Sequence, residues 1–276
     1  MYSVTSLMDQ EEFRGAVLNQ PKDQVCKLDD PPISPANYQH YCKRLGYNLS
    51  ALLDQRFKFL QDHIETGNTV LEVGAGQGVT KTFLPGINLI QTDVHAAPWL
   101  DATTSAEALP FGDAVFDAVI CIAALHHMNF PLRAIAELAR VTRKGGKVLV
   151  LEPHNSWLLR QLLMLSGYEY VDEGVDPFGA EPCLRSEDNW DGNNAIGDLL
   201  FGDQKRLRES LPDLEIIHHE YSECLMFMNS GGVNHRTPYI PLPRMILNLI
   251  LKIDKLLCRS APNIFALVQE VVLQKT

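Results

Sequence analysis

Basic residues are in the minority in this chain, and long apolar runs are missing from its start. The 276 residues hold 24 Lys and Arg against 34 Asp and Glu, a net charge of -10 at pH 7. Because binding to a phosphate backbone needs a basic face, this balance argues against a nucleic-acid partner. Asp9, Glu11 and Glu12 interrupt the first 17 residues, so no signal peptide is expected.

Cysteine is also scarce and shows no paired spacing. Six cysteines are scattered without a Cys-x-x-Cys pair: Cys26, Cys42, Cys121, Cys183, Cys224 and Cys258. This spacing favours reduced, mostly buried thiols over disulfides or a zinc site. A soluble enzyme of the cytoplasm is the expectation.

Glycine is concentrated where a short apolar strand is predicted to end. Residues 69–73 form that strand, and Gly74, Gly76 and Gly78 follow at alternate positions. Glycine lets a ligand approach the backbone and reaches positive φ in a tight turn. The helix that follows would present free N–H groups to the ligand. The pattern predicts a nucleotide-type site at the carboxyl end of the first strand of an open α/β sheet.

Two carboxylates narrow the chemical class of the expected ligand. Val79 stands where a dinucleotide fingerprint needs glycine, and Glu72 would repel a pyrophosphate but attract an ammonium group. Asp93 ends the next apolar segment, 21 residues after Glu72, close to the interval at which a carboxylate accepts from ribose hydroxyls. A nucleoside with a positive aminoacyl tail and no phosphates suits these residues. S-adenosylmethionine fits that description.

Four blocks in register from Val70 to Pro153 resemble the class I S-adenosylmethionine-dependent methyltransferases with small-molecule and lipid acceptors. The first block is the glycine turn, and the second is Leu109-Pro110-Phe111 together with residues 116–120. The third and fourth blocks are residues 124–128 and 140–147. The resemblance implies that Glu72 and residues 74–78, including Ala75, hold the aminoacyl part and Asp93 the ribose, and it adds Val94 and Leu125 to the cofactor site. Many relatives have Asp-Ala before the Leu-Pro-Phe for the adenine. This chain has Ser105, Ala106 and Glu107, any of which, or the backbone, could take that contact.

The predicted fold is α/β, a Rossmann-like, doubly wound, seven-stranded and mostly parallel sheet with helices on both faces. Strands are expected near 69–73, 88–92, 115–121, 147–152, 214–218 and 264–273, and helices over 50–65 and 131–142. The expected units are an N-terminal extension (1–49) and the methyltransferase domain (50–276), which divides into a cofactor half (66–153), an acidic aromatic insertion (about 154–212) and C-terminal strands with an apolar helix (213–276).

The segment 166–203 holds ten acidic residues and one basic residue, Arg185, with several aromatics. It is predicted to be either a lid over the carboxyl ends of the strands or a solvated excursion without a role. So many carboxylates raise the question of a divalent metal, but no ligand spacing supports one, and no metal is expected.

A second unusual segment, 241–260, has a broad apolar helical face that ends in Lys252, Lys255 and Arg259. It is shorter than the roughly 20 residues of a membrane span. The favoured interpretation is that this helix packs within the fold or in a homodimer interface. The alternative is peripheral contact with the inner membrane surface, which would suit a lipid-linked acceptor.

Because the methyl group of S-adenosylmethionine is already activated, the enzyme mainly has to align the acceptor behind the methyl carbon and exclude water. His126, His127 and His154 follow the fourth and fifth strands, and each is a candidate general base for a hydroxyl acceptor. A carboxylate acceptor would need no base. In relatives the pair at 126 and 127 commonly shapes the cofactor pocket instead. Glu152 is expected to be a hydrogen-bonding residue at a strand end.

Several signatures of other methyltransferases are missing. The Asn/Asp-Pro-Pro-Tyr/Phe segment of amino-group methylases and the two-glutamate loop of arginine methyltransferases do not occur, and no Pro-Cys pair follows the fourth strand, where cytosine C5 methylation would need it; the Pro182-Cys183 pair lies in the insertion. A small-molecule, lipid or sugar-type acceptor remains, with O-methyl transfer favoured. The alternatives are an inactive S-adenosylmethionine-binding regulatory module and, disfavoured by Val79 and Glu72, an NAD-dependent oxidoreductase.

Overall fold

The computed structural model describes residues 35–276, except 168, 187–190 and 232–236, with side chains from residue 47 onward. Most of the predicted N-terminal extension, and Tyr168 and Trp190 of the predicted insertion, lie outside the described residues.

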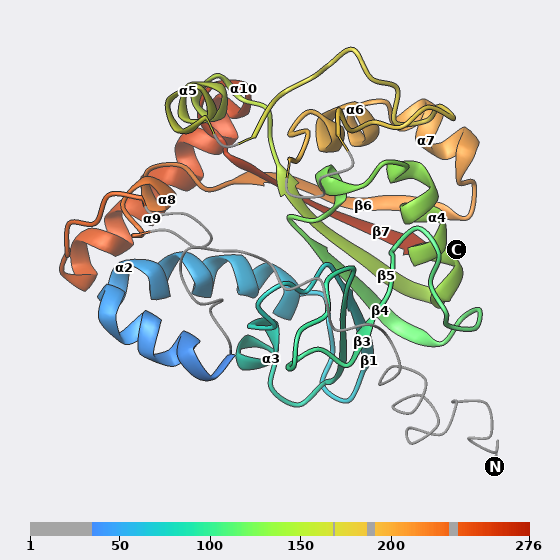
Figure 1. The fold of residues 1–276 in the computed structure, drawn as a ribbon. Coiled ribbons are helices and arrows are strands. Elements are labelled where there is room, and N and C mark those ends of the chain that lie inside the picture. The colour runs from blue at the N-terminus through green and yellow to red at the C-terminus, as the bar shows by residue number, and fades with distance from the viewer. Residues whose placement is uncertain (1–34, 168, 187–190, 232–236) are drawn as a thin grey trace.

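Seven strands form one sheet in the order β3-β2-β1-β4-β5-β7-β6 (Figure 1). Strand β7 is antiparallel to both β5 and β6, and the other neighbours pair in parallel. The predicted Rossmann-like, mostly parallel sheet is confirmed. The strands are β1 (Thr69–Val73), β2 (Asn88–Asp93), β3 (Ala102–Thr103), β4 (Phe116–Ile122), β5 (Thr142–Pro153), β6 (Leu214–Ser222) and β7 (Val268–Lys275).

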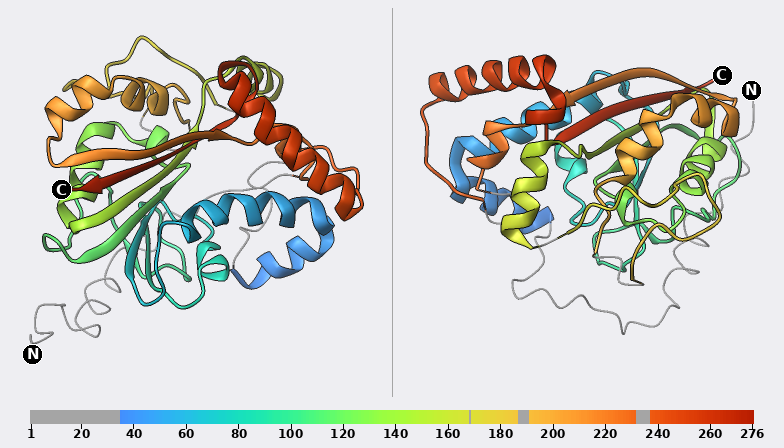
Figure 2. Two further views of the ribbon diagram at one scale, coloured as in Figure 1. Left: turned by 180° about the vertical axis from the view of Figure 1, so that it is seen from behind. Right: turned by 90° about the horizontal axis from the view of Figure 1, so that it is seen from above.

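Alternate residues of the central strands enter two separate cores, because side chains of a strand point to opposite faces. Leu71, Val119 and Val148 lie in one core, and Val70, Ala118 and Leu149 lie in the other. Helices α4, α6 and α7 contribute to the first core, and α2 contributes to the second. The sheet is thus covered on both faces, as Figure 2 shows.

The helices are α2 (Pro35–Gln61), α3 (Thr80–Phe83), η1 (Leu125–His127, a 3-10 turn), α4 (Pro131–Val141), α5 (Trp157–Ser166), α6 (Ile196–Gly202), α7 (Gln204–Ser210), α8 (Leu225–Met228), α9 (Arg244–Ser260) and α10 (Pro262–Phe265). The helix predicted over residues 50–65 therefore begins earlier, at Pro35, and ends earlier, at Gln61. Leu53, Phe57 and Leu60 lie buried on one face of this helix, and Ile64 is buried just after its end.

Two strand predictions need correction. Strand β5 begins at Thr142 instead of residue 147, because the chain passes directly from α4 into the sheet. The last strand begins at Val268 instead of residue 264, because Pro262 starts the short helix α10 and proline suits the first helical turn.

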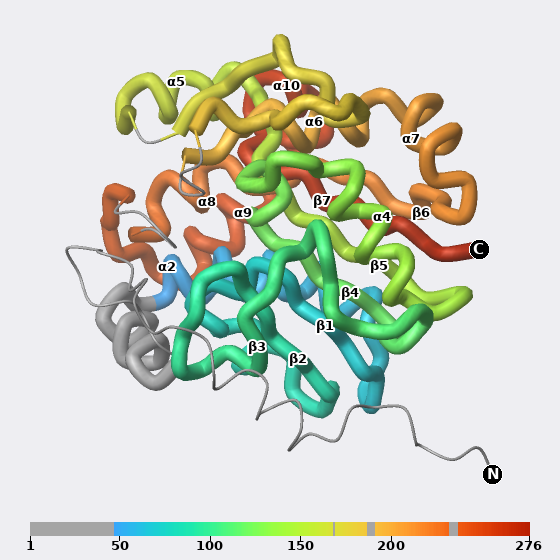
Figure 3. Tube along the Cα trace, turned by 45° about the vertical axis from the view of Figure 1, so that its right-hand side comes forward, coloured from blue at the N-terminus to red at the C-terminus, as the bar shows by residue number. Residues whose placement is uncertain are grey.

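The segment after α5 runs above α4 in Figure 3, and its helix α6 contacts both α4 and η1. It includes α6 and is joined to the η1 region by backbone hydrogen bonds from Asn193 to His126 and from Cys183 to Asn129. Among the described helices none is long and apolar enough to cross a membrane. The four cysteines with described side chains, Cys121, Cys183, Cys224 and Cys258, are free and buried.

Candidate active site

The glycine turn after β1 is open above Gly76 and closed on both sides of it. A Cβ at Gly74 would lie 2.4 Å from the Cβ of Ala124, and a Cβ at Gly78 would lie 2.6 Å from Trp99 Cδ1. A Cβ at Gly76 would meet nothing within 4 Å. All three residues have φ between 46° and 66°, which favours glycine. The turn therefore leaves room for a ligand at one point, above Gly76.

This turn lies at the topological switch point of the sheet. The chain proceeds from β1 through β2 to β3 in one direction and from β4 to β5 in the other. In open α/β sheets the crevice between such strands, at their carboxyl ends, is where ligands bind. The contact between Gly74 and Ala124 joins the ends of β1 and β4 at that crevice.

Asp93 supports the glycine turn from the end of β2. Its Oδ2 accepts a hydrogen bond from Gly76 N at 2.9 Å, and its Oδ1 accepts one from His95 N at 2.8 Å. Val94 beside it is an apolar residue with 47% of its surface exposed. Each carboxylate oxygen has a further lone pair, so Asp93 is placed and chemically able to accept from a ribose diol.

Glu72 is buried beneath the turn, with 3% of its surface exposed. Oε1 accepts from Thr80 Oγ1 at 2.6 Å and Oε2 accepts from Gln91 Nε2 at 2.7 Å. Burial raises its pKa to about 7, against the hydrogen bonds that lower it. Partners within the protein therefore hold both oxygens. The predicted contact with an ammonium group stays a prediction.

The candidate adenine residues differ in accessibility. Ser105 is exposed and Ala106 is buried, while Glu107 accepts from Phe130 N at 3.1 Å and so stabilises the start of α4. Leu125 is fully buried and packs in the core. Of these four residues, only Ser105 has an exposed and chemically suitable side chain.

His126 and His127 lie on η1, after a turn at Ala123, whose φ of 47° redirects the chain from β4. The Nδ1 of His126 lies 2.6 Å from Oε2 of Glu152. Glu152 also accepts from the backbone N–H groups of Ala124, Leu125 and His126. The predicted strand-end role of Glu152 is confirmed, and it fixes the orientation of the His126 ring.

A second acidic partner of these histidines comes from the insertion. Glu169 Oε1 lies 3.8 Å from Nε2 of His126 and 3.7 Å from Nε2 of His127, and Glu169 Oε2 accepts from Asn194 Nδ2 at 2.8 Å. Burial lowers the pKa of His126, but Glu152 and Glu169 outweigh it and raise that pKa to about 10. Although burial opposes this, the two histidines and Asn194 lower the pKa of Glu169 to about 2.

The insertion also packs closely against these two histidines. A Cβ at Gly192 would lie 2.5 Å from Cδ2 of His126 and 2.8 Å from Cε1 of His127. The described part of the insertion is therefore in direct contact with the candidate catalytic residues.

His154 is held apart from that pair. Its Nδ1 lies 2.6 Å from Oδ1 of Asp198 in α6, and its ring centroid is 4.5 Å from that of Tyr221 in β6. Its Nε2 is buried with no hydrogen-bond partner among the described residues. The structure thus brings His126 and His127 together and gives His154 different neighbours.

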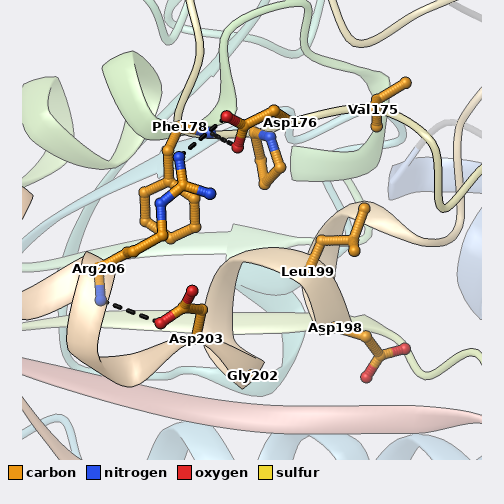
Figure 4. A pocket seen from close by; sticks show the side chains of 9 residues that line it. Val175, Asp176, Phe178, Asp198, Leu199, Gly202, Asp203 and Arg206 are labelled. Carbon is orange, nitrogen blue, oxygen red and sulfur yellow. Dashed lines mark hydrogen bonds and ion pairs between the residues drawn. The ribbon is translucent and has the colours of Figure 1, made fainter.

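A cavity of about 550 Å³ lies within the insertion, between residues 175–178 and helices α6 and α7 (Figure 4). The guanidinium of Arg206 lies over the Phe178 ring and is bonded to Asp176. Asp198 lines this cavity and connects it to His154. None of the predicted cofactor residues lines it, so the candidate site stays at the glycine turn, where Asp93 and Ala124 meet the glycines.

Two site residues were missed by the sequence-based predictions. Trp99 donates from Nε1 to the carbonyl of Gly76 at 2.9 Å, and an aromatic residue soon after Asp93 could have suggested this. Glu169 follows His127 by 42 residues, and no local pattern indicates that they meet.

The strand order and the glycine turn at its switch point define the class: the chain carries a class I S-adenosylmethionine-dependent methyltransferase domain. Residues 71–150 match the family described as methyltransferase domain.

Two curated relatives each match about a third of the chain. Over 98 residues it is 36% identical to a demethylmenaquinone methyltransferase of Renibacterium salmoninarum, covering 31% of this chain and 41% of the relative. Over 120 residues it is 34% identical to a ubiquinone/menaquinone biosynthesis C-methyltransferase of Burkholderia cenocepacia, covering 37% of this chain and 49% of the relative. The chain spans about half the length of these relatives.

Among solved structures, a SAM-dependent methyltransferase from Archaeoglobus fulgidus is 15% identical with a TM-score of 0.46. That comparison covers 81% of this chain and 93% of the other.

Proposed function

We propose that this protein transfers a methyl group from S-adenosylmethionine to a hydroxyl oxygen of a small-molecule acceptor. The observation that carries the proposal is the glycine turn at the switch point, open above Gly76 and supported by Asp93. The turn would hold the aminoacyl part and Asp93 the ribose. The match of residues 71–150 to the methyltransferase domain family supports the same cofactor.

When bound, S-adenosylmethionine supplies an activated methyl group. Transfer forms a bond between the acceptor oxygen and the methyl carbon while the carbon–sulfur bond breaks, and the electron pair of the broken bond stays on sulfur. The acceptor hydroxyl must lose its proton in this step. With no metal bound, His127, which is partly exposed and next to Ala124, is the better placed of the histidines to take that proton. His126 is fixed by Glu152, and its ring centroid lies 4.1 Å from that of His127.

Calorimetric titration tests the cofactor. We expect binding of S-adenosylmethionine and S-adenosylhomocysteine, and none of NAD. Binding of NAD alone would contradict the proposal and favour an oxidoreductase.

Transfer of a carbon-13 methyl group to phenol and quinol acceptors tests the reaction, because NMR distinguishes O-methyl from C-methyl products. The curated relatives are named for C-methylation in quinone biosynthesis, so a C-methyl product would overturn the choice of oxygen. Cofactor binding without transfer to any acceptor would favour a regulatory module.

We further propose that the acceptor has a large apolar part and that α9 contacts an anionic membrane surface. Met245, Leu249 and Leu256 expose 85%, 57% and 66% of their surfaces on this helix. Four exposed basic residues accompany them: Arg244, Lys252, Lys255 and Arg259. Basic residues concentrated beside exposed apolar ones, in a protein of net charge -10, favour an anionic lipid surface over a second acidic copy of the chain.

Flotation with phosphatidylglycerol vesicles tests the membrane contact. We expect salt-sensitive binding that is lost in Leu249→Gln/Leu256→Gln and kept in the control Ile217→Gln, which changes an exposed apolar residue on β6. Recovery of the whole protein in the soluble fraction would retire the proposal. Concentration-dependent dimerisation, lost in the same double variant, would favour a homodimer face.

A further inference from the structure

The carboxyl end of β4 gathers three potential metal ligands from two distant parts of the chain. One donor atom each from His126, His127 and Glu169 lies within 4.8 Å of the others. Glu169 Oε1 is 3.8 Å and 3.7 Å from the two Nε2 atoms. These separations are too long for direct hydrogen bonds. They are a few tenths of an ångström above the roughly 3.0–3.4 Å that separates neighbouring ligands around an ion with bonds of about 2.1 Å.

Two of the three ligands are already oriented by a second group. His126 directs Nδ1 to Glu152 at 2.6 Å, which leaves Nε2 on the side of Glu169. Glu169 uses Oε2 to accept from Asn194, which leaves Oε1 for the histidines. Metal-binding histidines typically donate their other N–H to a carboxylate in this way.

The charges of the cluster also favour a cation. Glu152 is fully buried, and the side chain of Glu169 is 14% exposed. In the described part of the chain, no lysine or arginine forms an ion pair with either carboxylate. Together the two carboxylates carry a charge of -2 that a divalent ion would balance in place of the proton on His126.

We propose that His126, His127 and Glu169 bind one divalent transition-metal ion. Two imidazole nitrogens and one carboxylate oxygen suit zinc, cobalt or iron better than magnesium or calcium, which prefer oxygen ligands. Three protein ligands leave at least one coordination position for water or for an acceptor oxygen. The use of that position by an acceptor rests on the proposed function, whereas the binding of the ion does not.

Cobalt(II) is the probe for this site because its visible absorption reports its ligands. The full-length protein, without an affinity tag and after treatment with a chelator, is titrated with Co²⁺. We expect about one ion per chain and no thiolate-to-cobalt absorption in the near ultraviolet. Glu169→Gln should weaken binding by at least about tenfold, and His127→Ala should do the same. The matched control Glu181→Gln removes an exposed carboxylate of the same insertion and should leave the affinity unchanged.

Three outcomes would overturn the proposal: no saturable binding by the wild-type protein, equal affinity in Glu169→Gln, or a thiolate absorption band. The wild-type titration remains decisive if a variant does not fold, which circular dichroism would reveal. S-adenosylhomocysteine binding is measured on the same preparation. Loss of cobalt binding alone would refute the metal site, and loss of cofactor binding alone would refute the proposed function.

Discussion

Glycines 74 and 76 meet two different constraints, although both have positive φ angles of 65° and 46°. An alanine at either position adopts a left-handed conformation that costs about 1–2 kcal/mol. At Gly74 the new methyl group would also meet Ala124, and overpacking of this kind costs about 1–3 kcal/mol more. We therefore predict that Gly74→Ala lowers the free energy of unfolding more than Gly76→Ala, as measured by urea denaturation.

For cofactor binding we expect the opposite order, so that Gly76→Ala loses more affinity than Gly74→Ala. Gly76→Ala places its methyl group where the ligand is expected, so S-adenosylhomocysteine affinity should fall in a protein that still folds. A Gly76→Ala variant with unchanged affinity would place the ligand elsewhere.

Asp93 is predicted to contribute to cofactor affinity through its acceptor oxygens. Asp93→Ala removes hydrogen bonds to a charged group, which costs about 1–3 kcal/mol or roughly one to two decades in affinity for S-adenosylhomocysteine. Asp93→Asn keeps one acceptor oxygen and should lose less. Asp113→Ala is the control, since Asp113 is exposed and pairs with Arg140. Unchanged calorimetric affinity in a folded Asp93→Ala variant would contradict the assignment.

At the scale of elements, the contact between the insertion and η1 distinguishes a lid from a solvated excursion. Gly192→Ala would force its methyl group against His126 and His127, and we expect it to lower methyl transfer while S-adenosylhomocysteine affinity stays within about threefold of wild type. Gly202→Ala is the control, because a methyl group there meets nothing within 4 Å. Transfer assays and calorimetry on both variants give the result. Equal activity in the two would favour the excursion.

For the whole molecule, two buried carboxyl groups predict that stability falls as pH rises. Burial raises the pKa of Glu72 to about 7, and burial with the nearby Glu223 and Glu220 raises that of Glu270 to about 7. Both folded values exceed the unfolded value near 4.5, so their stabilising contribution is complete below pH 4.5 and is lost as pH rises through 7. The loss is at most about 3 kcal/mol for the buried Glu72.

Urea denaturation between pH 5 and pH 8 measures this dependence. The decrease in free energy of unfolding should be smaller in Glu72→Gln/Glu270→Gln than in the wild-type protein. Equal decreases in the two proteins would show that these carboxyl groups do not titrate as the structure indicates.

The sequence by itself determined the cofactor half of this protein. A five-residue strand, three alternate glycines and an acidic residue at the next strand end are local patterns, and each is set by backbone conformation over a few residues. Short apolar strands alternating with helices then permit few arrangements other than a mostly parallel sheet covered on both faces. Six of the seven strands and the position of the turn followed from these local constraints, whereas β3, the strand order and the antiparallel β7 did not.

Only the tertiary structure decided the partners of the histidines and the environment of Glu72. Glu169 reaches His127 across 42 residues of sequence, through a segment in which ten acidic residues look alike. Glu72 was expected to face the ligand, but Thr80 and Gln91 hold both of its oxygens. His154 has the same local context as a base after a strand, yet α6 supplies Asp198 and holds it apart. Which of several like-charged or like-placed residues meet depends on how the chain packs after the sheet has formed, and packing between distant segments leaves no periodic trace in the sequence.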